Sequence, residues 1–249
     1  MIEIILCDDH ALIRRGIRDT LSDAPDMRVV GEAGDYGELR SLMRDLGAAR
    51  LDGRGDGRTD GRTDSRTDSR NDGRNLQTEA HRSAPCDVLV LDINLPGRSG
   101  LDVLHALKDE GSPVKVLVVS MYPEDQYAIR ALRAGAYGYV NKAGDPQLIV
   151  QAVRTVAQGR KYVTPEIAQM LVESLTMPAQ ENAHTTLSDR ELQTLVMIAS
   201  GKRLADIAEA LTLSPKTVSV YRSRVLEKLG MANNAELTVY AIRSGLVGQ

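Results

Sequence analysis

The sequence has only two cysteines, no long apolar segment and no large net charge. Cys7 and Cys86 both lie beside apolar runs typical of strands, so we expect buried, reduced thiols rather than a disulfide or metal pair. The amino terminus, MIEIILCDD, lacks a basic region followed by a long apolar stretch, and no run approaches the ~18 apolar residues of a membrane span. These absences predict a soluble, cytoplasmic protein.

The net charge of −3 over 249 residues gives no overall attraction for nucleic acid or membrane. Any DNA-binding surface must therefore be a local patch. The length suits two small domains, each burying its own core.

Short apolar runs rich in β-branched residues alternate with helix-period segments in the first part of the chain. This alternation predicts a doubly wound α/β domain, with five parallel strands and helices on both faces of the sheet. After Gly159 the strand signals stop and the pattern is helical. The predicted strands are 2–7, 28–33, 87–92, 115–120 and 138–141.

The change of pattern predicts an α/β domain over residues 1–157 and a linker over 158–185 with a short helix at 165–175. An all-α domain follows over 186–249.

Polar side chains lie at the carboxyl ends of the predicted strands or just beyond them, at the sheet edge where parallel α/β folds place their sites. Asp8, Asp9 and Asp92 are carboxylates, and Ser120 and Lys142 add a hydroxyl and an ammonium group. Two carboxylates ~4 Å apart repel by about 1 kcal/mol in water and by more inside a protein. Three together therefore indicate a bound cation, and oxygen ligands suit Mg²⁺.

A carboxylate beside Mg²⁺, with a hydroxyl and a lysine placed for new negative charge, fits nucleophilic capture of a phosphoryl group. Asp92 is the predicted nucleophile. The alternative is a solvated acidic rim with a chance salt bridge, which suits one Asp after a strand better than five matched residues.

The segments CDDH, LDINLPGRSG, VVSMY and GAYGYVNK resemble the receiver domain of two-component response regulators. The resemblance implies a flavodoxin-like fold with a phosphoacceptor aspartate, a Mg²⁺ site, two side chains that bind phosphoryl oxygens and a switch aromatic. These roles fall on Asp92 as phosphoacceptor; on Asp8, Asp9, Asp92 and the backbone carbonyl of Asn94 as metal ligands; on Ser120 and Lys142; and on Tyr139.

Three positions limit what the resemblance predicts. The family often has proline after the lysine, preceded by a cis bond, whereas Ala143 stands here. Asn94 and Tyr122 occupy positions that tune dephosphorylation in the family, so the lifetime of the phosphoryl group is not predicted.

The region from residue 186 onward shows the helix start and stop signals of a helix-turn-helix. Ser188 and Glu191 form a capping box, and Gly201 ends the first helix. After a second helix and the short turn TLS, Pro215 stands where a first helical position tolerates proline.

The third helix buries Val218 and Val225 on one side, while the opposite side is small, polar and locally basic. Val220 lies on that outer side among cations, which fits a thymine methyl beside phosphates. An ordinary solvated helix face is the alternative.

The segment 187–237 resembles the LuxR-type helix-turn-helix throughout. The resemblance implies double-stranded promoter DNA as a partner and a last helix, over 235–244, that forms a homodimer on DNA. Eight basic and six acidic side chains over 186–249 predict modest, salt-sensitive non-specific binding. The implied contacts are Ser219, Val220 and Ser223 to base edges; Lys216, Thr217, Tyr221, Arg222 and Arg224 to phosphates; and Leu237, Tyr240 and Ala241 between protomers.

A low-complexity insertion over 51–82 separates the second helix from the third strand, and its 51–74 part repeats a tetrapeptide six times. Its composition predicts a flexible, neutral loop, and loop closure costs little extra with length. A twelve-nucleotide unit makes replication slippage a sufficient origin; a contact with the DNA-binding domain is the alternative.

Together these features predict a phosphorylation-dependent DNA-binding regulator of the NarL/FixJ class rather than an enzyme. A sensor histidine kinase would phosphorylate Asp92, drawing Ser120 and Tyr139 inward and changing the surface of the fourth helix, fifth strand and fifth helix. One alternative is a Mg²⁺-dependent phosphohydrolase with Asp8 as nucleophile and a helical cap. The other is a regulator that works by protein contact without phosphorylation.

Overall fold

A computed structural model of the protein describes residues 1–52, 84–122, 124–176 and 183–247. Its first part is a five-stranded parallel sheet with the order β2-β1-β3-β4-β5. The predicted strands are confirmed to within one residue at each end. The strands are β1 Ile2–Cys7, β2 Met27–Ala33, β3 Val88–Leu91, β4 Lys115–Ser120 and β5 Gly138–Asn141.

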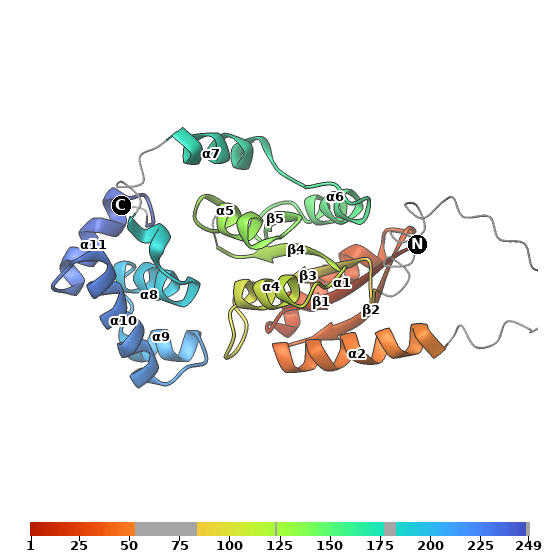
Figure 1. The fold of residues 1–249 in the computed structure, drawn as a ribbon, viewed down its shortest axis with the longest axis horizontal. Helices are drawn as coiled ribbons and strands as arrows, with labels where there is room; N and C mark the ends of the chain where they lie inside the picture. The colour runs from red at the N-terminus through yellow and green to blue at the C-terminus, as the bar shows by residue number, and fades with distance from the viewer. Residues whose placement is uncertain (53–83, 123, 177–182, 248–249) are drawn as a thin grey trace, which may run out of the picture.

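Helices cover both faces of the sheet (Figure 1). The face under α1 and α6 has one apolar core, and the face under α2, α4 and α5 has another. The β3, β4 and β5 strands are almost entirely buried, as parallel strands covered on both sides should be. The doubly wound α/β prediction is therefore confirmed. These helices are α1 Ala11–Ser22, α2 Tyr36–Asp52, α4 Gly100–Asp109, α5 Glu124–Ala134 and α6 Pro146–Ala157.

The second part is all-helical, as the sequence predicts. Ser188 caps α8 in a capping box with Glu191, and Gly201 after the helix has a φ of 80°. Ser214 caps α10, with Pro215 at its first position and Gly230 in the left-handed region at its end. The elements are α7 Pro165–Thr176, η1 Ala183–Thr186, α8 Asp189–Ala199, α9 Leu204–Ala210, α10 Pro215–Leu229 and α11 Asn234–Arg243.

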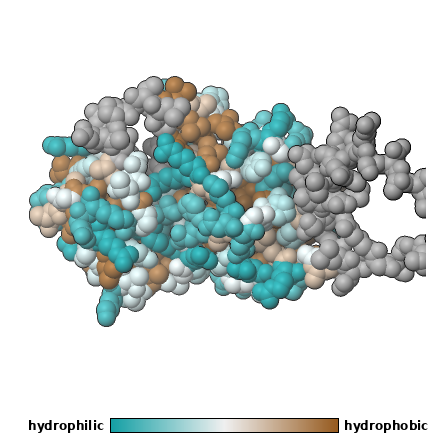
Figure 2. Space-filling view, viewed as in Figure 1, coloured by the Kyte–Doolittle hydropathy of each residue, from teal (hydrophilic) through white to brown (hydrophobic). Residues whose placement is uncertain are grey.

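The helix α7 packs on α5, and the helices from α8 onward lie at one end of the α/β part, with α8 facing α4 and α5 (Figure 1). One apolar cluster runs continuously from the α4 and α5 side of the sheet into the core of the helical part. Hydrophilic side chains cover most of the face in Figure 2, and hydrophobic colour is confined to small patches.

The insertion falls between α2 and β3, as predicted. Residues 51 and 52 of its first repeat belong to the end of α2, and the remainder lies outside the described residues. Among the helices that the structure describes, none is long and apolar enough to cross a membrane.

Gly100 sets how closely α4 approaches the strand that ends at the acidic cluster. A Cβ on this residue would lie 2.0 Å from the carbonyl oxygen of Asp92 and 2.8 Å from the Cα of Ile93. The Gly100 amide also donates to the Ile93 carbonyl at 2.8 Å. Only glycine fits this contact without moving the backbone.

We expect Gly100→Ala to lower the free energy of unfolding by about 1–3 kcal/mol or more, because the methyl group overlaps backbone atoms. Urea unfolding checks this. Gly16→Ala is the matched control, because a Cβ in the middle of α1 meets nothing within 4 Å and should add about 0.5–1 kcal/mol. Equal stability of the two variants would contradict the expectation.

Candidate functional site

Strand register brings the acidic residues together. Cys7 of β1 pairs with Leu91 of β3, so the residues that follow, Asp8 and Asp92, lie side by side. The Asp92 amide donates to the Cys7 carbonyl at 2.9 Å, which fixes the end of β3 against β1. Both carboxylates are 4% exposed. The site therefore depends on the pairing of two neighbouring strands and not on a flexible loop.

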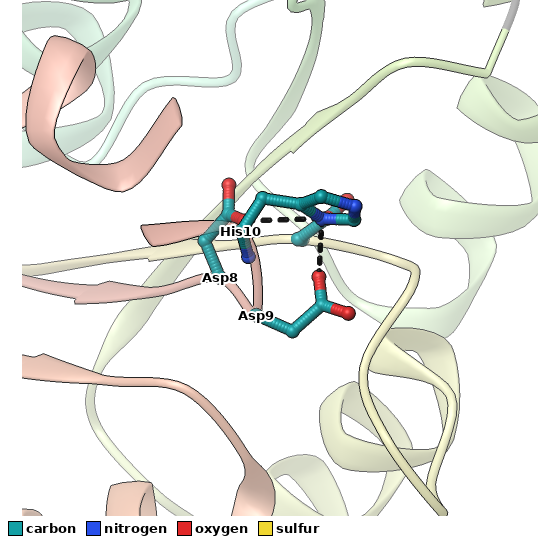
Figure 3. Close-up of side chains that lie close together, drawn as sticks. Asp8, Asp9 and His10 are labelled. Atoms are coloured by element: carbon teal, nitrogen blue, oxygen red, sulfur yellow. Dashed lines mark hydrogen bonds and ion pairs between the residues drawn. The ribbon is translucent and has the colours of Figure 1, made fainter. Parts of the chain in front are cut away.

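Four side chains offer ligand atoms within 4.8 Å of one another: Asp8, Asp9, His10 and Asp92. Figure 3 shows three of them, with His10 beside the carboxylate of Asp9. Carboxylate oxygens from three residues are the hard donors that Mg²⁺ takes. The residues present thus fit a magnesium ion.

Lys142 lies between two of the carboxylates. Its Nζ is 2.6 Å from Oδ2 of Asp8 and 2.7 Å from Oδ2 of Asp92, and its side chain is 4% exposed. Burial raises the pKa of Asp92, and attraction to Lys142 opposes that rise. A buried cation touching a buried carboxylate is an arrangement able to bind an anionic group transferred to that carboxylate.

The end of β5 positions Lys142. Ser120 of β4 pairs with Asn141 of β5, and the Lys142 amide donates to the Ser120 carbonyl at 2.9 Å. Ser120 is 1% exposed. All peptide bonds of the described residues are trans, including the bond before Ala143.

Two residues beside the acidic cluster had no role in the sequence analysis. His10 Nδ1 lies 2.6 Å from the carboxylate of Asp9, although the side chain is 55% exposed. Arg14 donates to the backbone carbonyl of Asp8 and pairs with Glu32 at 3.1 Å, which holds the acidic turn against β2. Adjacency to the Asp-Asp pair could have revealed His10; the pairing of Arg14 with β2 needs the fold.

Tyr139 already has an inward position. It is fully buried, and its hydroxyl donates to the Tyr122 carbonyl at 2.6 Å. Burial raises its pKa well above the usual range. The inward placement that we expected to follow phosphorylation is therefore present in this structure, so a change of state need not begin with movement of this ring.

The outer face of α10 is open. Lys216, Ser219, Ser223 and Arg224 are exposed, and Val220 is 44% exposed, while Val218 and Val225 are buried. The hydroxyls of Ser219 and Ser223 donate to the carbonyls four residues earlier, at 3.0 Å each. Their oxygens remain available to accept a hydrogen bond.

Three of the predicted phosphate-contacting residues are less exposed than the outer face of α10. Thr217, Tyr221 and Arg222 are half-buried. Arg222 Nε donates to Oδ1 of Asn234 at 2.5 Å, joining α10 to α11. Lys228, another cation of this helix, pairs with the buried Glu191 at 2.6 Å. The cations on the open face are therefore Lys216 and Arg224.

Comparison with known proteins supports the domain types predicted for both halves of the chain. The family model for the response regulator receiver domain matches residues 62–154, and that for bacterial regulatory proteins of the luxR family matches residues 185–241. The response regulator GacA of Pseudomonas aeruginosa is 34% identical over 248 residues, covering 99% of this chain and 98% of GacA. The response regulator UvrY of Escherichia coli is 34% identical over 247 residues, covering 99% and 96%.

The chain belongs to the response regulators. It joins a receiver domain to a LuxR-type helix-turn-helix DNA-binding domain. A solved structure of RcsB from Salmonella enterica serovar Typhimurium, bound to promoter rprA with the phosphomimetic BeF3−, covers 96% of this response regulator and 97% of RcsB. At 22% identity and a TM-score of 0.54, that likeness shows the fold alone.

Two of the three predicted dimer contacts of this response regulator, Leu237 and Ala241, need correction. Leu237 and Ala241 are fully buried inside the helix-turn-helix domain. The Tyr240 hydroxyl accepts from the His184 amide and contacts His184 Nδ1, both at 3.0 Å. The outer face of α11 instead carries Val239, 48% exposed, and Ile242, 36% exposed. Helical periodicity identified the apolar side of α11, but this side packs within its own domain.

Proposed function

We propose that this response regulator accepts a phosphoryl group on Asp92 from a sensor histidine kinase and thereby controls promoter binding through α10. The observation that carries the proposal is the buried Lys142 ammonium in contact with the carboxylates of Asp8 and Asp92. The predicted domain boundaries, 1–157, 158–185 and 186–249, and the cytoplasmic location belong to the same proposal.

In the transfer step, a carboxylate oxygen of Asp92 forms a bond to phosphorus. The bond from phosphorus to the donor nitrogen breaks, and the donor leaves with its electron pair. Lys142 and Ser120 bind the phosphoryl oxygens on Asp92. Because Asp92 is buried directly after β3, the acyl phosphate formed on it would be largely surrounded by protein.

Asp8, Asp9, Asp92 and the backbone carbonyl of Asn94 would hold Mg²⁺. The ion supplies positive charge that offsets the negative charge of the phosphoryl oxygens. A phosphoryl group brings about −1.5 to −2 charges next to buried carboxylates. Without the ion, only Lys142 would offset that charge.

Asp92→Asn should abolish acyl phosphate formation, because the amide cannot act as the nucleophile. The measurement is incorporation of labelled phosphoryl from acetyl phosphate in the presence of Mg²⁺, with hydroxylamine used to release an acyl phosphate. Asp109→Asn, at the exposed end of α4, is the matched control and should be labelled normally. Labelling that persists in Asp92→Asn would assign the nucleophile elsewhere, with Asp8 as the first candidate.

We propose that α10 enters the major groove, with Ser219, Val220 and Ser223 at base edges. The donor hydrogens of both serines are occupied by helix carbonyls. Their free lone pairs therefore favour bases that present a donor, adenine N6 or cytosine N4. Val220 supplies the apolar contact for a thymine methyl, and Lys216 and Arg224 supply cations for phosphates.

Lys216→Ala should weaken binding to all DNA sequences and lower the slope of log K against log salt by about 0.9, the value for one phosphate contact. Val220→Ala should instead weaken cognate DNA selectively, by about 1 kcal/mol. Fluorescence anisotropy at several salt concentrations separates the two effects. Lys108→Ala, an exposed lysine on α4, is the control and should leave both slope and preference unchanged.

We propose that two copies pair on DNA through the outer face of α11. A groove of about 480 Å³ runs along this face, lined by Val239, Tyr240, Arg243 and Met231 among others. Exposed apolar side chains beside a groove favour self-association over simple solvation. A two-fold contact here would join two recognition helices into one unit, as symmetric DNA half-sites require.

Replacing both Val239 and Ile242 with Asp should abolish cooperative binding to a two-half-site fragment while leaving single half-site affinity nearly unchanged. Gel-shift titration on both fragments measures this. Val172→Asp tests a comparably exposed valine, 63% exposed on α7, and should keep cooperativity. Undiminished cooperativity in the double variant would place the dimer contact on another surface.

A further inference from the structure

Lys142 contacts only some of the oxygen atoms in the acidic cluster. Its Nζ lies against Oδ2 of Asp8 and Oδ2 of Asp92. The other oxygen of Asp92, Oδ1, is buried and has no hydrogen-bond partner among the described residues. Oδ1 of Asp9 is likewise buried without a hydrogen bond. The oxygens that Lys142 does not contact are therefore candidate ligand atoms for a cation.

His10 lies beside the same oxygens (Figure 3). Its Nδ1 is 2.6 Å from Oδ1 of Asp9 and 3.8 Å from Oδ1 of Asp8. Ligand atoms that share one ion at about 2.0–2.2 Å lie about 3–4 Å from each other. The imidazole nitrogen thus has the spacing of a further ligand next to the carboxylates.

The backbone fixes where the His10 ring can lie. His10 is the residue before the first turn of α1, in an extended conformation, and its amide donates to Oδ1 of Asp8 at 2.8 Å. Its side chain makes no capping hydrogen bond to the helix. Because the ring has no part in starting α1, it can bind an ion without destabilising the helix.

A nitrogen ligand changes which ions a carboxylate site prefers. Mg²⁺ takes oxygen ligands and keeps several of its waters. Imidazole instead suits transition ions such as Fe²⁺, Ni²⁺ and Zn²⁺, whose affinity for mixed nitrogen and oxygen sites also rises along the series. An imidazole at position 10 should therefore favour transition ions while adding little for Mg²⁺.

We propose that His10 is a ligand of the acidic site, and that its imidazole makes the site bind divalent transition ions of the Fe²⁺ to Zn²⁺ series in preference to Mg²⁺. The inference rests on the metal site of the proposed function and adds one nitrogen to its oxygen ligands. Because both classes of ion use the carboxylates of Asp8, Asp9 and Asp92, they compete for a single site, and position 10 decides between them.

Full-length wild type and His10→Ala are titrated separately with Co²⁺ and with Mg²⁺ by isothermal titration calorimetry. Loss of the imidazole should weaken Co²⁺ binding at least about tenfold, because loss of an outer-shell partner alone costs that much. Mg²⁺ affinity should stay nearly unchanged, because Mg²⁺ takes oxygen ligands. His105→Ala is the matched control, since His105 is an exposed histidine on α4, and it should bind both ions as wild type does.

A second variant, His10→Asp, exchanges the nitrogen ligand for oxygen. Aspartate is also a favoured residue at a helix start, so this variant should fold. It should bind Mg²⁺ more tightly than wild type and lose the preference for Co²⁺. Thermal unfolding of each variant shows whether it is folded, and His10→Asp decides the test if His10→Ala is not.

Proton NMR of the Co²⁺-loaded protein gives a readout that a merely structural role would not produce. The unpaired electrons of Co²⁺ strongly shift the ring protons of a histidine whose nitrogen binds the ion. Wild type and His105→Ala should both show such signals, and His10→Ala should lack them.

The proposal is overturned if wild type shows no shifted histidine signals, or if folded His10→Ala binds Co²⁺ as tightly as His105→Ala. An equal loss of Co²⁺ and Mg²⁺ binding in folded His10→Ala also overturns it, because His10 would then only support the acidic turn. Failure of the proposed function looks different. Wild type would still bind Co²⁺ through His10 but would take up no phosphoryl group at Asp92.

Discussion

The pairing of β1 with β3 is the constraint on which the rest of the molecule depends. It places Asp8 and Asp92 next to each other at low exposure, and two buried carboxylates in contact are unfavourable unless a cation accompanies them. Lys142, delivered by β5, meets that requirement from the protein's own side chains. The pairing of the strands therefore creates a site that could bind a metal cation or stabilise a phosphoryl group on Asp92.

Much of the fold and of the acidic site could be predicted because strand and helix signals are local in the sequence. Strand runs with β-branched residues predict the sheet, and the polar residues at the ends of β1, β3, β4 and β5 predict the site, since parallel strands share one carboxyl edge. The Ser188 capping box and Pro215 fixed the helix starts in the same way. Each helix start depends on residues within about one helical turn of one another.

The errors share a cause as well. Leu237 and Ala241 have the apolar spacing of an interface, but the same spacing serves a domain's own core, and the sequence does not say which partner the face meets. Arg190 reads as an ordinary charged residue in a first helical turn, yet it is buried against a receiver loop 95 residues earlier in the chain. Contacts between domains leave no periodic pattern in the sequence, so only the folded structure reveals them. Tyr139 is similar: its identity was predictable, its inward rotamer was not.

The absence of a side chain at Gly100 has a mechanical meaning. With its amide bonded to Ile93 and its Cα against the Asp92 carbonyl, the first turn of α4 sits directly on the main chain of the phosphoacceptor. No side chain lies between Gly100 and the Asp92 backbone. A small shift of the end of β3 would therefore displace α4 directly, because close-packed backbone atoms transmit movement. Any movement of the Asp92 backbone would therefore reach α4 through main-chain contact, because every other amino acid would place a Cβ between the two segments.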